Sequence, residues 1–139
     1  MSAASDYLED KVLDHVLGNT AFTQPASLYL GLFTSSGGLE DNTSGSQTEV
    51  SGGSYARKDI DVDASSGAFD AASGGSTSNT QTITFDAATA NWGTITHIAV
   101  MDASTGGNVL FWGAVTTSKT IESGDTFQVS AGNLTISLA

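Results

Sequence analysis

The apolar residues of this chain are concentrated in two neighbouring runs, Ile95–Met101 and Val109–Val115. A short polar segment ending in Gly106-Gly107 separates them. Glycine readily adopts the positive φ that a tight reversal needs, so the pattern predicts a β-hairpin. We expect this hairpin to form the centre of the fold.

Both arms of this hairpin carry apolar residues on both faces. A strict two-residue period places Ile95, Ala99 and Met101 on one face of the first arm, and Ile98 and Val100 on the other. The same period places Val109, Phe111 and Val115 opposite Leu110, Trp112 and Ala114 on the second arm. Such strands lie centrally in a sheet that is covered on both sides, or against a partner chain.

An amphipathic pattern predicts one α-helix over residues 5–18. Its apolar stripe consists of Leu8, Val12, Leu13, Val16 and Leu17. Asp6 is the expected N-cap, with Glu9 three residues later completing a capping box. Gly18-Asn19 supplies a left-handed stop after the last turn.

Shorter alternating segments predict the remaining strands. Ser27–Thr34 places Leu28, Leu30 and Leu32 on one face and Tyr29 and Phe33 on the other. Further strands are expected from Tyr55 to Asp63 and over Gln81–Phe85. The C-terminal segment predicts a second hairpin, in which Phe127 and Val129 precede a turn at Gly132-Asn133 and Leu134, Ile136 and Leu138 follow it.

These elements predict a mainly β protein, a single domain over residues 1–139. About seven strands over residues 27–138 would form a β-sandwich or a related β-barrel behind the N-terminal helix. Long loops rich in Gly, Ser and Thr are expected at residues 35–48 and 64–80.

Charge and composition narrow the classes of partner. Four basic residues stand against fifteen acidic ones, for a net charge of −11. Nucleic-acid binding and binding to an anionic membrane both need clustered Lys and Arg, so we expect neither partner. The longest apolar stretch, Leu28–Phe33, is too short to span a bilayer, and no secretory signal is visible at the N-terminus. There are no cysteines, so the fold needs no oxidising compartment.

No catalytic residues or cofactor are predicted. The two histidines are isolated: His15 has no second ligand at i+3 or i+4, and His97 lies inside the central strand. Three aspartates, Asp59, Asp61 and Asp63, share one face of a predicted strand and are a weak calcium candidate. The favoured alternative is a solvated face that protects an edge strand, because no EF-hand spacing accompanies the acids.

Five segments resemble a family of small virion proteins of tailed bacteriophages, whose members are often labelled phage tail fibre protein. They are DYLEDKVLDHVLG (6–18), SLYLGLFT (27–34), TEVSGGSYAR (48–57), WGTITHIAVMD (92–102) and LFWGAVTTSKTIESGDTF (110–127). The resemblance covers nearly the whole chain and transfers no active site. It implies a structural virion protein, assembled in the host cytoplasm.

Two locations in the particle are compatible with this resemblance. We expect a capsid decoration (cement) protein on the outer shell, with a tail-fibre or adhesin module that contacts the host surface as the alternative. The chain has no heptads, β-helical repeat or extended shaft, which favours the first reading. Its partners would be the major capsid protein or other virion proteins.

We also expect a homo-oligomer, because one thin sandwich cannot easily cover all this apolar surface. A trimer is the favoured state because it follows from the capsid reading, in which local three-fold positions on the shell are natural docking sites. The interface candidates are Leu8, Val12 and Val16 on the helix, together with Tyr55 and Arg57. The alternatives are that the helix packs on its own sandwich and that Arg57 holds a loop of its own chain. For Arg57, we slightly favour the contact with a loop of its own chain over a contact with a neighbouring subunit.

Overall fold

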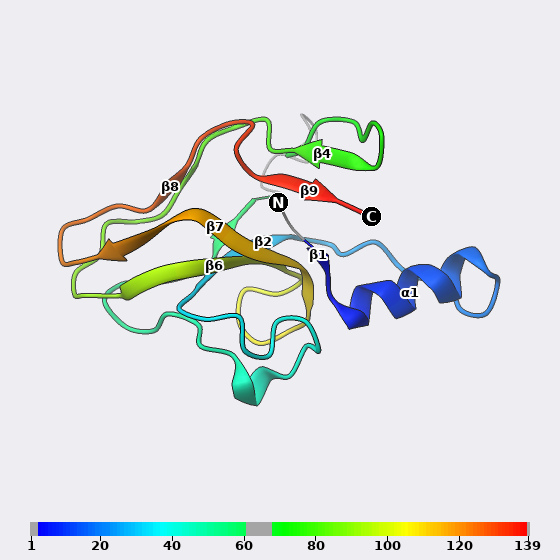
Figure 1. The fold of residues 1–139 in the computed structure, drawn as a ribbon, viewed down its shortest axis with the longest axis horizontal. Helices are drawn as coiled ribbons and strands as arrows, with labels where there is room; N and C mark the ends of the chain where they lie inside the picture. Colours follow the sequence, from blue (N-terminus) through cyan, green and yellow to red (C-terminus); the bar gives the residue numbers. More distant parts are fainter. Residues whose placement is uncertain (1–2, 61–67, 139) are drawn as a thin grey trace.

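Five antiparallel strands form the main sheet of the protein, whose computed structural model describes residues 3–60 and 68–138. The predicted hairpin lies at the centre, made of β6 (Gly93–Met101) and β7 (Val109–Ile121). β2 (Tyr29–Phe33) pairs with β6, and the short strands β1 (Ala3–Ala4) and β3 (Lys58–Asp59) form the edges (Figure 1). The strand order is β1-β7-β6-β2-β3.

The two faces of this sheet carry separate hydrophobic clusters, as the doubly apolar hairpin predicted. Leu30 and Leu32 of β2 belong to the larger cluster, whereas Phe33 belongs to the smaller one on the opposite face. The predicted division of β2 is therefore confirmed. The loop after β2, which includes a 3-10 turn at Ser44–Ser46, covers the smaller cluster by burying Leu39 completely.

A β-bulge changes the predicted faces of β7. Val100 pairs with Phe111, but the next residue, Met101, pairs with Val109, so Leu110 is an extra residue without an opposite partner. Leu110 and Phe111 consequently both join the larger cluster. The strict alternation that grouped Phe111 with Val109 was wrong for this reason.

Two further face assignments were also wrong. Trp112 packs with Val109 in the smaller cluster, not with Leu110. The β6–β7 register shifts a second time between Ile95 and His97, and Ile95 consequently lies in the larger cluster, apart from Ala99 and Met101. The sequence alone gives no sign of either register shift.

A narrow two-stranded ribbon forms the second layer, over the larger cluster (Figure 1). At one end β4 (Ser76–Ser78) pairs with β9 (Thr135–Ser137), and at the other β5 (Ile83–Thr84) pairs with β8 (Gln128–Val129). The predicted C-terminal hairpin is therefore wrong, because β8 and β9 pair with strands that precede the central hairpin. β4 also lies within residues 64–80, which were expected to form a loop.

Buried Asn79 holds the ribbon together where its two halves meet. Its Nδ2 donates to the carbonyl oxygens of Gln81 (2.7 Å) and Ser130 (3.1 Å), and its Oδ1 accepts the Leu134 N–H at 2.9 Å. Its backbone carbonyl accepts the N–H of Gly132 at 2.8 Å. The turn expected at Gly132 exists, but it serves as a kink within one ribbon edge.

The helix α1 (Asp6–Val16) forms close to the predicted bounds, but its N-cap is Ser5, not Asp6. The buried Ser5 hydroxyl accepts the Leu8 N–H at 3.3 Å and donates to the carbonyl of Val109, which ties the helix start to β7. The predicted capping box is therefore wrong by one residue. Gly18 adopts φ +82° and ends the helix as predicted.

The described residues contain nine strands and one α-helix, so the mainly β fold is confirmed. The ribbon packed on the sheet gives the two-layer arrangement of a sandwich. No helix in the part of the chain that the structure describes is long and apolar enough to span a membrane.

Replacing Asn79 with alanine should destabilise the protein by about 2–4 kcal/mol, because the buried Leu134 N–H and two part-buried carbonyl groups lose their partner. Urea denaturation of Asn79→Ala against the wild type measures this loss. Asn133→Ala is the matched control, since Asn133 is exposed and follows Gly132, whose N–H bonds to the Asn79 carbonyl. Equal stability of the two variants would contradict the role assigned to Asn79.

Candidate interaction surfaces

Arg57 joins three segments of its own chain. Its Nε and Nη2 donate to Oε1 and Oε2 of Glu49 at 2.7 and 2.8 Å. Its Nη1 donates to the carbonyls of Ala103 and Gly106, both at 2.7 Å, in the loop between β6 and β7. With 4% of its side chain exposed, Arg57 is engaged within the chain, which is the alternative that the sequence analysis favoured.

Tyr55 lies behind this ion pair. Its hydroxyl donates to Glu49 Oε1 at 2.8 Å and accepts the Leu32 N–H at 3.0 Å, so it connects the Glu49 side chain to the sheet. Burial, together with the negative charge of Glu49, raises the pKa of Tyr55 well above its usual range. Tyr55, which was predicted as an interface candidate, therefore makes its main contacts within its own chain.

The Tyr55 ring also belongs to an aromatic cluster that the sequence analysis missed. Its centroid lies 5.4 Å from Trp92, edge-on, and 6.3 Å from Phe85, stacked. Phe127 meets Phe85 edge-on at 5.8 Å. These aromatic residues are far apart in the sequence, so no local pattern could have revealed that they meet.

The glycines at 52 and 53 allow the chain to reach this cluster. Both have positive φ, at +75° and +57°, which glycine adopts without strain in a sharp turn. The Gly53 carbonyl accepts the Trp92 Nε1–H at 2.9 Å, and a Cβ on Gly53 would lie 2.9 Å from that nitrogen. The turn thus fixes Trp92 against Tyr55.

The three helical interface candidates differ in their environment. Leu8 is buried in the larger cluster, and Val12 packs against it partly buried. Val16 is 71% exposed. Its neighbours Leu13 and Leu17 are also exposed, so the inner half of the helix binds its own domain and the outer half is open to a partner.

An apolar cleft of about 280 Å³ lies between the β4–β9 end of the ribbon and the main sheet. The bulge residues Leu110 and Phe111 contribute to its floor, and Leu138 is exposed on its wall. Because the bulge turns two consecutive apolar side chains toward the cleft, sequence periodicity could not have predicted it.

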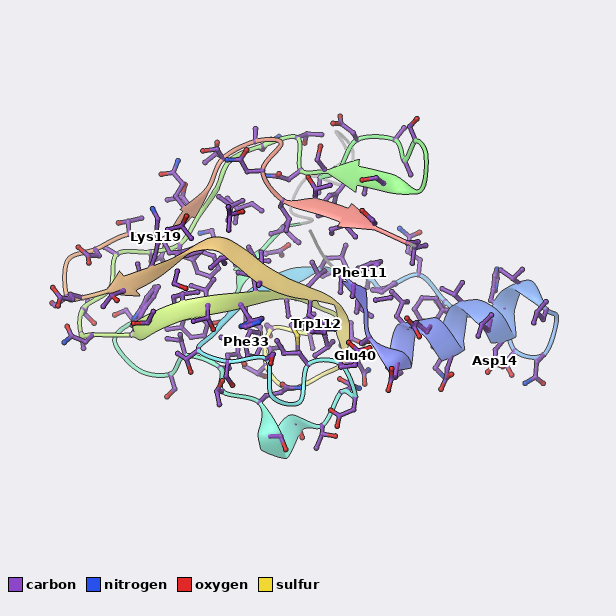
Figure 2. All side chains as sticks on the ribbon, viewed as in Figure 1. Asp14, Phe33, Glu40, Phe111, Trp112 and Lys119 are labelled. Carbon is purple, nitrogen blue, oxygen red and sulfur yellow. The ribbon has the colours of Figure 1, made fainter. Side chains whose placement is uncertain are left out.

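A second cleft, of about 340 Å³, lies between β7 and the β8–β9 edge and has mixed walls. Phe127, Val129 and Leu134 provide apolar surface. The polar lining includes Thr116, Thr117, Lys119, Gln128, Ser130 and Asn133. Figure 2 shows Lys119 at the end of β7 that lies away from the helix carrying Asp14.

The remaining candidates provide no assembled chemical site among the described residues. His15 is exposed, and its Nδ1 accepts the N–H of Phe22 at 3.1 Å. His97 is half-buried beside Trp112, its Nδ1 lies 2.8 Å from the Thr96 hydroxyl, and burial lowers its pKa.

The predicted calcium candidate can be followed only in part. Asp59 lies on the edge strand β3, where it pairs with Tyr29. Asp61 and Asp63 fall outside the described residues. Within residues 3–60 and 68–138, no group of three His or acidic residues is close enough to hold a metal ion. Calcium binding therefore stays a weak prediction.

The described residues form a small, acidic, mainly β fold with two surface clefts and an exposed apolar helix end. The model of one protein family, described as Podophage GP4 fiber I protein gp80, matches residues 3–137. The chain belongs to this family, and the resemblance found in the sequence is confirmed. It is a structural component of a tailed-phage virion. No curated protein matches the chain significantly.

Replacing Arg57 with lysine should destabilise the protein by about 1–3 kcal/mol, because lysine keeps the charge but lacks the planar fork. Chemical denaturation measures the loss, and hydrogen exchange should quicken most in the loop at residues 102–108. The control is Lys58→Met, which removes an exposed ion pair with Asp86 and should cost under about 1 kcal/mol. Uniform exchange across the sheet would contradict a local clamp.

The raised pKa of Tyr55 predicts a loss of stability in alkali. Unfolded Tyr55 ionises near pH ~10, whereas the folded chain keeps its proton, so the free energy of unfolding falls as pH rises above ~10. The slope from this group approaches about 1.4 kcal/mol per pH unit, and below that pH it contributes none. Tyr55→Phe should show a shallower decline in denaturation series around pH 9–11. Parallel declines would refute the assignment.

Proposed function

We propose that this chain is a subunit of a tail fibre, in which it forms a compact module that contacts the host surface. The observation that carries the proposal is the family match over residues 3–137, because the family description names a fibre protein. The sequence analysis expected capsid decoration and kept the fibre as its alternative. The family description favours that alternative.

The small size of the protein does not oppose this function. Residues 3–60 and 68–138 form no shaft, but a fibre can combine a shaft from one polypeptide with compact modules from others. The exposed end of α1 and the apolar cleft provide surfaces for assembly with such chains. The partners proposed for this chain are accordingly other tail proteins of the virion.

The proposed role is binding, without catalysis. The mixed cleft along β7 and β8 is the surface we assign to the host, because its hydroxyl, amide and lysine groups can bind a polar ligand over an apolar floor. The acidic charge of the chain disfavours strongly anionic ligands.

Antibodies raised against the purified chain should label the tail of intact phage in electron microscopy. The copy number per particle should match the tail symmetry and fall far below the number of capsomers. The same antibodies should slow adsorption to host cells, and antibodies against the major capsid protein serve as the control. Label spread over the capsid shell would overturn the proposal and restore the decoration reading.

A further inference from the structure

The exposed large apolar side chains of the described residues occur in only two places. Leu13, Val16 and Leu17, at the outer end of α1, are 57%, 71% and 78% exposed. The fourth, Leu138, is 55% exposed and belongs to the wall of the apolar cleft. A grouping of this kind marks an interaction surface more often than isolated exposed residues do.

The outer end of α1 forms an apolar knob made of Leu13, Val16 and Leu17. These residues are spaced i, i+3 and i+4, so they share one helix face. The helix extends away from the sheet (Figure 1), while Leu8 anchors its inner half in the core. The bond from Phe22 N–H to His15 Nδ1 ties the returning chain to the helix, so the knob is held in place.

The apolar cleft can receive such a knob. A cavity of roughly 150 Å³ holds a benzene molecule, so the 280 Å³ of this cleft has room for about two branched aliphatic side chains. Its lining is almost entirely apolar and includes no residue of α1. The knob of a given chain therefore leaves that chain's own cleft open.

We propose that the knob of one copy docks into the apolar cleft of a neighbouring copy of this chain. A second copy is the occupant because both halves of the contact lie on the same polypeptide. A different partner would cover one half and leave the other exposed. Such a head-to-tail contact joins two different patches, and it forms a closed ring when the rotation between neighbouring copies closes. The inference goes beyond the fibre assignment and does not depend on it.

The salt dependence of association distinguishes this apolar contact from one held by opposite charges. Asp10 and Asp14 lie on the helix, Asp70 lines the cleft, and the chain carries a net charge of −11. Like charges therefore approach as the knob enters the cleft. Salt screens this repulsion and strengthens apolar association, so the oligomer should become more stable as ionic strength rises.

Engineered cysteines test the contact directly, because the chain has none of its own. Leu17→Cys and Leu138→Cys are prepared as separate proteins, one bearing a tag, then mixed and oxidised. The expected product is a disulfide-linked pair of one tagged and one untagged chain in the mixture, while each variant oxidised alone should form little cross-linked dimer. Both residues are exposed, so folding should survive, and circular dichroism verifies it.

A different pairing would overturn the inference. Efficient cross-linking of Leu17→Cys to itself would show a symmetric helix–helix contact, and no cross-link at all would show that knob and cleft do not meet. In sedimentation, Leu13→Glu combined with Leu17→Glu should weaken association by more than about tenfold. Ala131→Glu, at an exposed turn, is the charge control and should change it little. A wild-type chain that stays monomeric at high salt also refutes the contact, whatever the fibre test shows.

Discussion

The structure depends on one constraint: the central hairpin is apolar on both faces and needs a cover on each. Two strands alone cannot bury such surfaces, so the chain on either side of the hairpin supplies two different covers. The ribbon of β4, β5, β8 and β9 covers one face, and the loop after β2 covers the other through Leu39. Most of the remaining features hold these covers in position.

Buried and half-buried polar side chains fix the covers where regular pairing is too short to do so. Asn79 replaces missing ladder bonds at the kink of the ribbon, and Asn42 bridges the covering loop to Asn108 and Val109 at the start of β7. Arg57 connects Glu49 to the loop between the central strands. A buried polar group is stabilising only when its partners are present, so each of these bonds specifies one arrangement of the loops.

The same constraint explains where unsatisfied apolar surface remains. The ribbon is narrow, and a bulge directs both Leu110 and Phe111 toward it, so the cover leaves an open cleft at the β4–β9 end. The helix is anchored at Ser5 and Leu8 and extends its outer apolar end away from the body (Figure 1). A virion protein present in several copies can use such surfaces for assembly, since a single chain leaves them exposed.

The sequence by itself determined the local elements. Amphipathic periodicity located the helix, the apolar runs around Gly106-Gly107 located the central hairpin, and the alternation in β2 divided its side chains between two cores. These features depend on residues that lie close together in the sequence. The absence of clustered basic residues likewise led to the expectation that neither nucleic acid nor an anionic membrane is a partner.

Tertiary structure decided the rest, because those features depend on residues distant along the chain. The C-terminal segment had the pattern of a hairpin, but pairing with strands before the central hairpin buries Ile83, Phe85 and Ile136 in the shared core. The two shifts in the β6–β7 register change the faces of Ile95 and Phe111, and no local signal encodes an extra residue in a ladder. The cleft, the aromatic cluster around Tyr55 and the exposure of Leu13 and Leu17 all follow from that packing, since burial depends on which distant segment covers each side chain.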